Sequence, residues 1–215
     1  LPAWKAAAFK AVGNGLFNKV ALRWAAADVF WPSEAHVFGF NLPMVRAPGN
    51  PQKWRVEERS EDLQADRLQR SRHNLWIINY LPVDGQTMLV ALTTGTLARQ
   101  MQAMDDDEVV QRVLAALGAM FKHEQQVPPP AEALVSRWDR DEFARGSYSF
   151  AKKGWRGAVD LDALIAPIGK EAGIGAHDSV FFAGEATSED RPGYMDGAIT
   201  SGQREARRIL HAVNA

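Results

Sequence analysis

An acidic residue follows a glycine at the end of a short apolar run in FFAGEATSEDRPGYMDGA, residues 181–198. The stretch closes on Gly-Ala, where an Ala-rich helical pattern begins, and a helix N-terminus attracts electron-rich groups through its free N–H groups. A glycine at a strand end lets a ligand approach the backbone, and the following acid, Glu185, can accept hydrogen bonds from hydroxyl groups. These residues indicate a nucleotide or flavin site between Glu185 and the helix start at 195–198. A generic strand–helix unit gives a similar pattern, so that interpretation stays open.

A lysine and several aromatic residues are the other candidates for chemistry. Lys19 lies between apolar residues in LFNKVAL, where an ammonium group is costly unless it faces solvent or a polar partner. Trp138 and Tyr148 lie ten residues apart in RWDRDEFARGSY, and Tyr194 belongs to the closing stretch. Two tyrosine rings can form the walls of a cage that guides an amine. A surface lysine and two core tyrosines remain the structural alternatives.

Composition narrows the class of protein. The chain has 215 residues, 46% of them hydrophobic and 24% charged, as in ordinary globular proteins. Its net charge of −1 argues against a general nucleic-acid binder, and no window reaches the ~18 apolar residues that a membrane span needs. The absence of cysteine excludes disulfides and thiolate chemistry. The five histidines lack metal-ligand spacing, and helix capping explains the three aspartates at 105–107, so we expect no metal site.

Helical and strand patterns are mixed along the chain. Helices are expected at 2–12, 104–125 and 197–213, with a shorter helix or turn at 162–170. Strands are expected at 17–24, within 30–43, on both sides of an Asp84-Gly85 primed turn, at both ends of 133–150, and as a buried strand at 179–184. The charged segment 52–73 is assigned to a solvated helix or mobile surface insertion, and Arg204, Arg207 and Arg208 to the outer side of the last helix. This order predicts an α/β protein of mixed α+β type with two subdomains.

Four ordered stretches carry a resemblance to a known family. They are LPAWKAAAFKAVGNGLFNKVALRW, GQTMLVALTTGTLA, RWDRDEFARGSYSF and FFAGEATSEDRPGYMDGAITSGQREARRI. Together they resemble the flavin-containing amine oxidases, which include monoamine oxidases, polyamine oxidases and lysine-specific histone demethylases. The resemblance covers nearly the whole chain and is weakest between residues 46 and 73.

The resemblance implies roles for individual residues in binding FAD. Gly184 and Glu185 match the Gly-acid pair that contacts the cofactor, and Tyr194 and Met195 match positions beside the isoalloxazine. Ala198 belongs to the same helix start, and Trp138 matches a tryptophan that packs against the flavin.

The resemblance also implies catalytic roles. Tyr148 and Tyr194 match the two walls of the family's aromatic cage, and Lys19 matches a lysine that reaches flavin N5 through a water and assists reoxidation by oxygen. Some monoamine oxidases attach the flavin through a cysteine immediately before the cage tyrosine. That position is Ser147 here, so FAD is expected to be bound non-covalently.

The resemblance divides the chain into a substrate-binding portion at 1–137 and, at 138–215, the closing strand–helix portion of a Rossmann-like FAD-binding domain. The family's G-x-G-x-x-G motif is not found, because the glycines at 13 and 15 precede a strand pattern. The chain also begins without methionine. We therefore expect it to be the C-terminal half of an amine oxidase, incomplete by itself, with the FAD-binding N-terminal half on the same or another chain.

The implied reaction is oxidation of an amine to an imine by hydride transfer to FAD, with oxygen giving hydrogen peroxide. A histone-demethylase-like enzyme, an L-amino-acid oxidase and a non-catalytic fragment remain alternatives. The expected binding partner is a small-molecule amine, and binding to nucleic acid or to a membrane is not expected. We also expect a homodimer and a cytoplasmic location.

Overall fold

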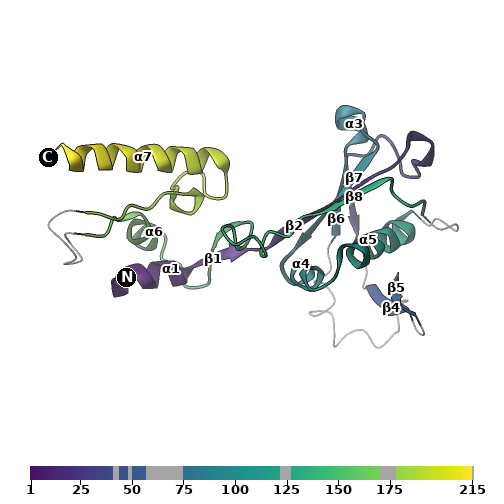
Figure 1. Ribbon diagram of the computed structural model, residues 1–215, viewed down its shortest axis with the longest axis horizontal. Helices are drawn as coiled ribbons and strands as arrows, with labels where there is room; N and C mark the ends of the chain where they lie inside the picture. Colours follow the sequence, from purple (N-terminus) through teal and green to yellow (C-terminus); the bar gives the residue numbers. More distant parts are fainter. Residues whose placement is uncertain (41–43, 48–49, 57–74, 122–126, 170–177, 215) are drawn as a thin grey trace. The chain divides into compact units, whose positions relative to one another are not determined.

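The computed structural model describes all residues except 41–43, 48–49, 57–74, 122–126, 170–177 and 215 (Figure 1). The chain forms two compact units. Unit 1 contains Leu1–Gly15 and Ser147–Ala215, and unit 2 contains Leu16–Gly146.

Unit 2 is built on a five-stranded antiparallel sheet with the strand order β3-β6-β7-β2-β8. Its strands are β2 (Phe17–Arg23), β3 (Val37–Phe40), β6 (Leu75–Asn79), β7 (Met88–Thr94) and β8 (Glu132–Val135). A separate antiparallel pair consists of β4 (Met44–Ala47) and β5 (Asn50–Val56), and η1 (Ala26–Asp28) is a short 3-10 helix.

Strand β2 has the alternation that its sequence predicts. Val20 and Leu22 are buried, whereas Lys19 and Arg23 are exposed on the other face. An alternating strand buries one face and leaves the other to solvent or to a ligand. Lys19 is therefore on the side of the sheet that does not contribute to the core.

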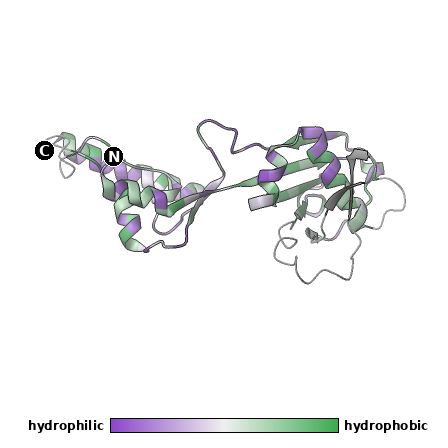
Figure 2. Ribbon diagram, turned by 90° about the horizontal axis from the view of Figure 1, so that it is seen from below, coloured by the Kyte–Doolittle hydropathy of each residue, from purple (hydrophilic) through white to green (hydrophobic). Residues whose placement is uncertain are grey.

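Two helices cover the apolar face of unit 2, α4 (Gly95–Gln102) and α5 (Asp106–Met120). Asp105 caps α5, because its carboxylate accepts a 2.7 Å hydrogen bond from the backbone N–H of Glu108, as the sequence predicts. The buried face of α5 joins aliphatic and tryptophan side chains of the sheet and its loops in one hydrophobic core. Figure 2 shows hydrophobic residues along the strands of this sheet and both kinds of residue on the helices.

The β6–β7 hairpin is confirmed, but the predicted turn is wrong. Leu81–Asp84 form the one-turn helix α3, and Gly85 follows in the left-handed region with φ +79°. Of the two central residues only Gly85 has positive φ, whereas a type I′ turn needs it at both and a type II′ turn needs it at the first, Asp84. The buried Asn79 explains the helical turn, since its side-chain oxygen accepts a hydrogen bond from Leu81 N at 3.1 Å.

The described residues of unit 1 form three main helices and a small sheet. The elements are α1 (Ala3–Ala11), β1 (Val12–Gly15), β9 (Tyr148–Ala151), α6 (Ala158–Ile165), the 3-10 turn η3 (Glu185–Thr187) and α7 (Met195–Val213). Strands β1 and β9 pair antiparallel, although they are far apart in sequence. Both strand ends of 133–150, the first helix and the last helix agree with the sequence prediction. The short helix or turn expected at 162–170 is formed earlier in the chain, as α6, and shares only residues 162–165 with it.

Three expectations from the sequence are corrected. The predicted buried strand at 179–184 is not formed: Val180 makes a single bridge to Ile168 and is 47% exposed, because no longer strand pairs with it among the described residues. Residues 52–56 of the predicted charged helix belong to strand β5, and the rest of that segment lies outside the described residues. Arg204 is directed into unit 1, where it donates to backbone carbonyls.

The compact units also differ from the division at 137/138. Residues 1–15 belong with the C-terminal part because β1 pairs with β9, and the second boundary falls between Gly146 and Ser147. The assignment of one part to substrate and the other to FAD stays a prediction.

Candidate functional site

Glu185 lies at the centre of the polar contacts of the closing stretch. One carboxylate oxygen accepts a hydrogen bond from the backbone N–H of Ser149 at 2.8 Å. The other accepts from the Ser149 hydroxyl at 2.8 Å and from the backbone N–H of Gly193 at 2.6 Å. The acid therefore joins strand β9 to the turn that precedes α7. Ser149, to which the sequence assigns no role, is its main partner.

The structure brings the neighbourhoods of the two predicted cage tyrosines together. Tyr148 begins β9, and Tyr194 is the N-cap residue of α7. A Cβ placed on Gly193 would lie 4.0 Å from the Tyr148 ring carbon Cδ2, so the Tyr148 ring is adjacent to the residue before Tyr194. Both tyrosines are exposed, by 44% and 59%, so neither is a core residue of unit 1.

Arg191 covers one face of the Tyr194 ring. Its guanidinium carbon lies 4.6 Å from the ring centroid, and its Nε is 3.0 Å from a carboxylate oxygen of Asp196. The pairing with Asp196 partly neutralises this guanidinium. One face of Tyr194 is thereby occupied by the chain itself.

The start of α7 is tightly built against the preceding turn. Met195 is 80% exposed, and the N–H of Ala198 donates to Tyr194 O at 3.2 Å as part of the first helical turn. A Cβ on Gly197 would lie only 2.0 Å from Arg191 O. Only glycine allows the turn to approach the helix this closely.

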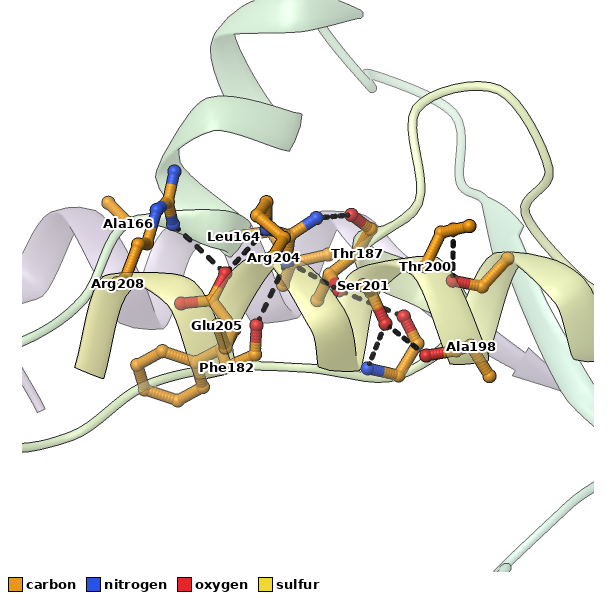
Figure 3. A network of polar contacts seen from close by, with 12 residues as sticks. Leu164, Ala166, Phe182, Thr187, Ala198, Thr200, Ser201, Arg204, Glu205 and Arg208 are labelled. Atoms are coloured by element: carbon orange, nitrogen blue, oxygen red, sulfur yellow. Dashed lines mark hydrogen bonds and ion pairs between the residues drawn. The ribbon is translucent and has the colours of Figure 1, made fainter. Parts of the chain in front are cut away.

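Side chains of α7 also hold the segment that carries Glu185 (Figure 3). Ser201 accepts a hydrogen bond from Gly184 N at 2.9 Å and donates to Ala198 O at 2.7 Å. Arg204 donates to Thr187 O at 2.8 Å and to Phe182 O at 3.1 Å. The helical spacing of Ser201 and Arg204 places both on one face, which is the sequence signal that could have identified them.

A fully buried lysine supports the same region from α1. Lys5 Nζ donates to the carbonyl oxygens of Leu164 at 2.6 Å and Ala166 at 2.7 Å, and it lies 3.4 Å from the centre of the Phe182 ring. Burial lowers the pKa of Lys5 to about 8, and the negative charge of Glu205 opposes that shift. In the sequence, Lys5 looks like an ordinary lysine of an amphipathic helix.

Lys19 and Trp138 belong to unit 2. The backbone N–H of Lys19 donates to the Ser136 hydroxyl at 2.7 Å, and its side chain is exposed. Trp138 is 46% exposed, and its backbone N–H donates to the side-chain oxygen of Asn18 at 3.3 Å. The structure therefore brings Trp138 beside the strand position next to Lys19. The predicted role of each at the flavin stays a prediction.

The residues of unit 1 fit the flavin part of FAD. A Cβ on Gly184, whose φ is +130°, would meet no atom within 4 Å, so the backbone before Glu185 is open to a ligand. The Glu185 carboxylate can accept about four hydrogen bonds and accepts three within the chain. The exposed Tyr194 and Met195 mark the adjoining N-terminus of a long helix.

The described residues also bear on two other features, a metal site and a membrane span. No group of three His, Cys, Asp or Glu side chains is placed to hold a metal ion there. None of the helices in the described part of the chain is both long and apolar enough to cross a membrane.

Comparisons with known proteins agree on one family. The chain is 35% identical over 214 residues to Histone demethylase-like protein A of Aspergillus fumigatus, covering 99% of this chain and 17% of that protein. It is 33% identical over 213 residues to Lysine-specific histone demethylase 1 homolog 2 of Oryza sativa subsp. japonica, covering 99% and 24%. The chain thus spans about a fifth of the length of these relatives.

A solved structure shows the same fold. Cyclohexylamine oxidase from Brevibacterium oxydans superposes with a TM-score of 0.62 at 22% identity, covering 100% of this chain and 39% of that one. The model of the family described as flavin containing amine oxidoreductase matches residues 1–210. The chain therefore belongs to the flavin-containing amine oxidoreductase family, whose cofactor is FAD.

Proposed function

We propose that this chain forms part of an FAD-dependent amine oxidase. The observation that carries the proposal is the junction of β9 with the turn before α7, where the Tyr148 ring lies next to Gly193 and the Glu185 carboxylate accepts hydrogen bonds from Ser149 N and Gly193 N. The reaction removes a hydride from the carbon next to the amine nitrogen and a proton from the nitrogen, leaving an imine. Water then converts the imine to a carbonyl compound and an amine or ammonia. Oxygen takes up the two electrons and two protons as hydrogen peroxide.

The chain's own residues bind and orient the reactants. FAD, when bound, supplies the two-electron acceptor. Glu185 and the helix start at Tyr194–Ala198 would hold the flavin end. The proposed packing of Trp138 against the flavin rests on the family resemblance. The exposed rings of Tyr148 and Tyr194 orient the amine. Arg191 covers one face of Tyr194, which leaves the opposite face for the substrate.

Small amines are the substrate class that we propose first, because the two tyrosine rings fit a compact amino group. A methylated lysine side chain is the second candidate, and the observation in its favour is that relatives at 33–35% identity are named as histone demethylases. The two substrates require the same chemistry at the nitrogen. The two substrates differ in the rest of the molecule attached to the amine nitrogen, which would lie outside the pair of tyrosine rings.

The test uses the intact protein that contains this chain. Its absorbance spectrum should show bound flavin, which a small amine bleaches under anaerobic conditions and oxygen restores with stoichiometric hydrogen peroxide. Bleaching by a methylated lysine peptide and by no free amine would favour the second substrate. A flavin that neither substrate reduces would contradict the proposed activity.

Lys19 is proposed to act in reoxidation. It is an exposed lysine on the face of β2 opposite the core, so its ammonium group is not used in the packing of unit 2. In Lys19→Met, stopped-flow traces should show reoxidation by oxygen slowed by about tenfold or more, with anaerobic reduction by amine changed far less. Arg23→Met, at the exposed end of the same strand face, is the matched control. Unchanged reoxidation would remove Lys19 from the site.

We propose that the FAD is held without a covalent bond from this chain. Ser147 precedes Tyr148, and a serine hydroxyl is almost un-ionised near neutral pH, so it is a far weaker nucleophile than a thiolate. Acid precipitation of the intact enzyme should release all of its flavin into the supernatant. Flavin that stays with the pellet would contradict this.

The remaining proposals concern the rest of the protein. We expect tight FAD binding to need an N-terminal dinucleotide-binding half, as the relatives' greater length suggests. The 215-residue chain purified by itself should then retain no stoichiometric flavin. A homodimer and a cytoplasmic location are also proposed, and size measurement and cell fractionation test them.

A further inference from the structure

The contacts of Glu185 connect three elements of unit 1. The carboxylate belongs to η3, its two Ser149 donors belong to β9, and its Gly193 donor belongs to the turn before α7. Two of the three donors are backbone N–H groups of residues that directly neighbour the tyrosines: Ser149 follows Tyr148, and Gly193 precedes Tyr194. A carboxylate that accepts bonds from both backbones sets the separation of those two segments.

These hydrogen bonds use most of the acceptor capacity of the acid. A carboxylate offers about four lone-pair positions on two oxygens. One oxygen accepts from Ser149 N, and the other accepts from both Ser149 Oγ and Gly193 N. A single further position, on the first oxygen, is left for a cofactor hydroxyl. Most of the acid's bonds are therefore made to its own chain.

We call the three hydrogen bonds that Glu185 accepts from Ser149 and Gly193 the Glu185 clamp. Side chains of α7 hold the backbone on both sides of Glu185 in place. Ser201 accepts a hydrogen bond from the N–H of Gly184, the residue before Glu185, and Arg204 donates to the carbonyl of Thr187, two residues after it. The Glu185 backbone is thus held on both sides by side chains of one helix. Bonds between an ionised carboxylate and N–H groups are stronger than neutral ones, so the clamp keeps β9 and the turn together without a ligand.

We propose that Glu185 is a positioning residue for the substrate cage, in that its carboxylate holds the Tyr148 and Tyr194 segments at a separation that accepts an amine. The statement that the two tyrosines bind an amine rests on the proposed function. The clamp itself does not, because its hydrogen bonds lie entirely within unit 1. A glutamate that only binds the cofactor would leave the two segments independent of its charge.

Hydrogen exchange on the full-length enzyme tests the clamp without any turnover. In Glu185→Gln, at most one amide oxygen can replace the two carboxylate oxygens, and the NH₂ group faces donors. Exchange in peptides covering residues 147–151 and 189–197 should become faster by about tenfold or more in both segments. Glu189→Gln, an exposed acid in the same loop, is the control and should leave both segments unchanged.

Ser149→Ala provides a milder variant. It removes the hydroxyl donor and keeps both backbone donors, so it should speed exchange in both segments by a smaller factor. Acceleration confined to 147–151, or absent from both variants, would overturn the proposal. If Glu185→Gln does not fold, the result for Ser149→Ala decides in the same way.

Steady-state kinetics then separate positioning from cofactor binding. At saturating FAD, Glu185→Gln should raise the KM for the amine by about tenfold, with a much smaller change in the Kd for FAD. A raised Kd for FAD with an unchanged KM would show a cofactor ligand only and would overturn the proposal. Should no amine be oxidised at all, the proposed function fails, while the exchange result still decides on the clamp.

Discussion

In unit 2 the most deeply buried side chains are mainly aliphatic, such as Leu22, Ile77 and Leu117, whereas in unit 1 they include Lys5, Asp160 and Ser201. Unit 2 therefore has a conventional hydrophobic core between a sheet and two helices. Unit 1 is held by hydrogen bonds and charges that join α1, α6, η3 and α7.

The difference teaches what each kind of interior can do. The stability of an apolar core depends mainly on how well its volume is filled, so side chains there can shift slightly. The stability of a buried polar network depends on hydrogen-bond distances and angles, so it fixes the positions of its residues more closely. Most of the candidate cofactor residues, Gly184, Glu185, Tyr194, Met195 and Ala198, belong to unit 1, and Trp138 belongs to unit 2. Unit 1 also leaves apolar side chains exposed along α7, at Ile199, Ile209, Leu210 and Val213.

The largest expected effect on stability comes from a substitution in the apolar core of unit 2. Leu22 is fully buried in the central part of unit 2, so Leu22→Ala should lower the free energy of unfolding by about 3 to 4 kcal/mol, from lost burial and the cavity left behind. Leu134→Ala, at a 65% exposed position of the neighbouring strand β8, is the control and should cost well under 1 kcal/mol. Denaturant unfolding measures both. Equal losses would contradict the assigned core.

A pair of glycines tests the close packing of unit 1. Gly197→Ala places a Cβ against Arg191 O, so the turn must move and stability should fall by about 2 kcal/mol. Gly202→Ala is on the same helix, where a Cβ meets nothing within 4 Å, and it should stabilise by about 0.5 to 1 kcal/mol. Thermal unfolding of the two variants should thus show shifts of opposite sign. A loss in both would mean that helix propensity does not govern position 202.

The third prediction concerns the charge of Lys5. Its pKa of about 8 lies below the ordinary value of 10.5, so between these pH values the unfolded state binds more protons than the folded state. The contribution of Lys5 to the free energy of unfolding is therefore lower at neutral pH and rises between about pH 8 and 10.5, by on the order of 3 kcal/mol at most.

Lys5→Met should remove this part of the pH dependence, while Lys10→Met, an exposed lysine of the same helix, should keep it. Urea unfolding at several pH values between 7 and 10.5 provides the measurement. Identical pH profiles for Lys5→Met and the unchanged protein would refute the buried ammonium.

Local sequence signals predicted the elements whose causes are local. The capping of α5 by Asp105 and the alternation of β2 need only neighbouring residues, and both are confirmed. The turn after β6 was predicted wrongly because the Asn79 side chain sets it while also bonding Trp31, which is distant in sequence. The segment 179–184 has the composition of a buried strand, but a strand also needs a partner, which composition does not supply.

The candidate site shows the same limit. Glu185, Tyr148 and Tyr194 were identified through their motifs, yet nothing local indicates that Ser149 and Gly193 donate to the acid. Lys5 was missed because its partners are carbonyl oxygens at the end of α6, more than 150 residues away in sequence. Backbone partners leave no trace in the pattern of residue types.

The pairing of β1 with β9 has a consequence for how such a protein can be rebuilt. The chain leaves unit 1 after Gly15 and returns at Ser147, whose N–H donates to Gly15 O at 2.7 Å. Unit 2 is therefore a cassette inserted into a loop whose two ends already adjoin, as in a two-residue β-hairpin. Replacing the cassette by a short Asn-Gly turn would keep every bond to Glu185, because all its donors are in unit 1. The hydrogen bonds around Glu185 are thus encoded entirely by the two chain segments of unit 1, whatever sequence joins Gly15 to Ser147.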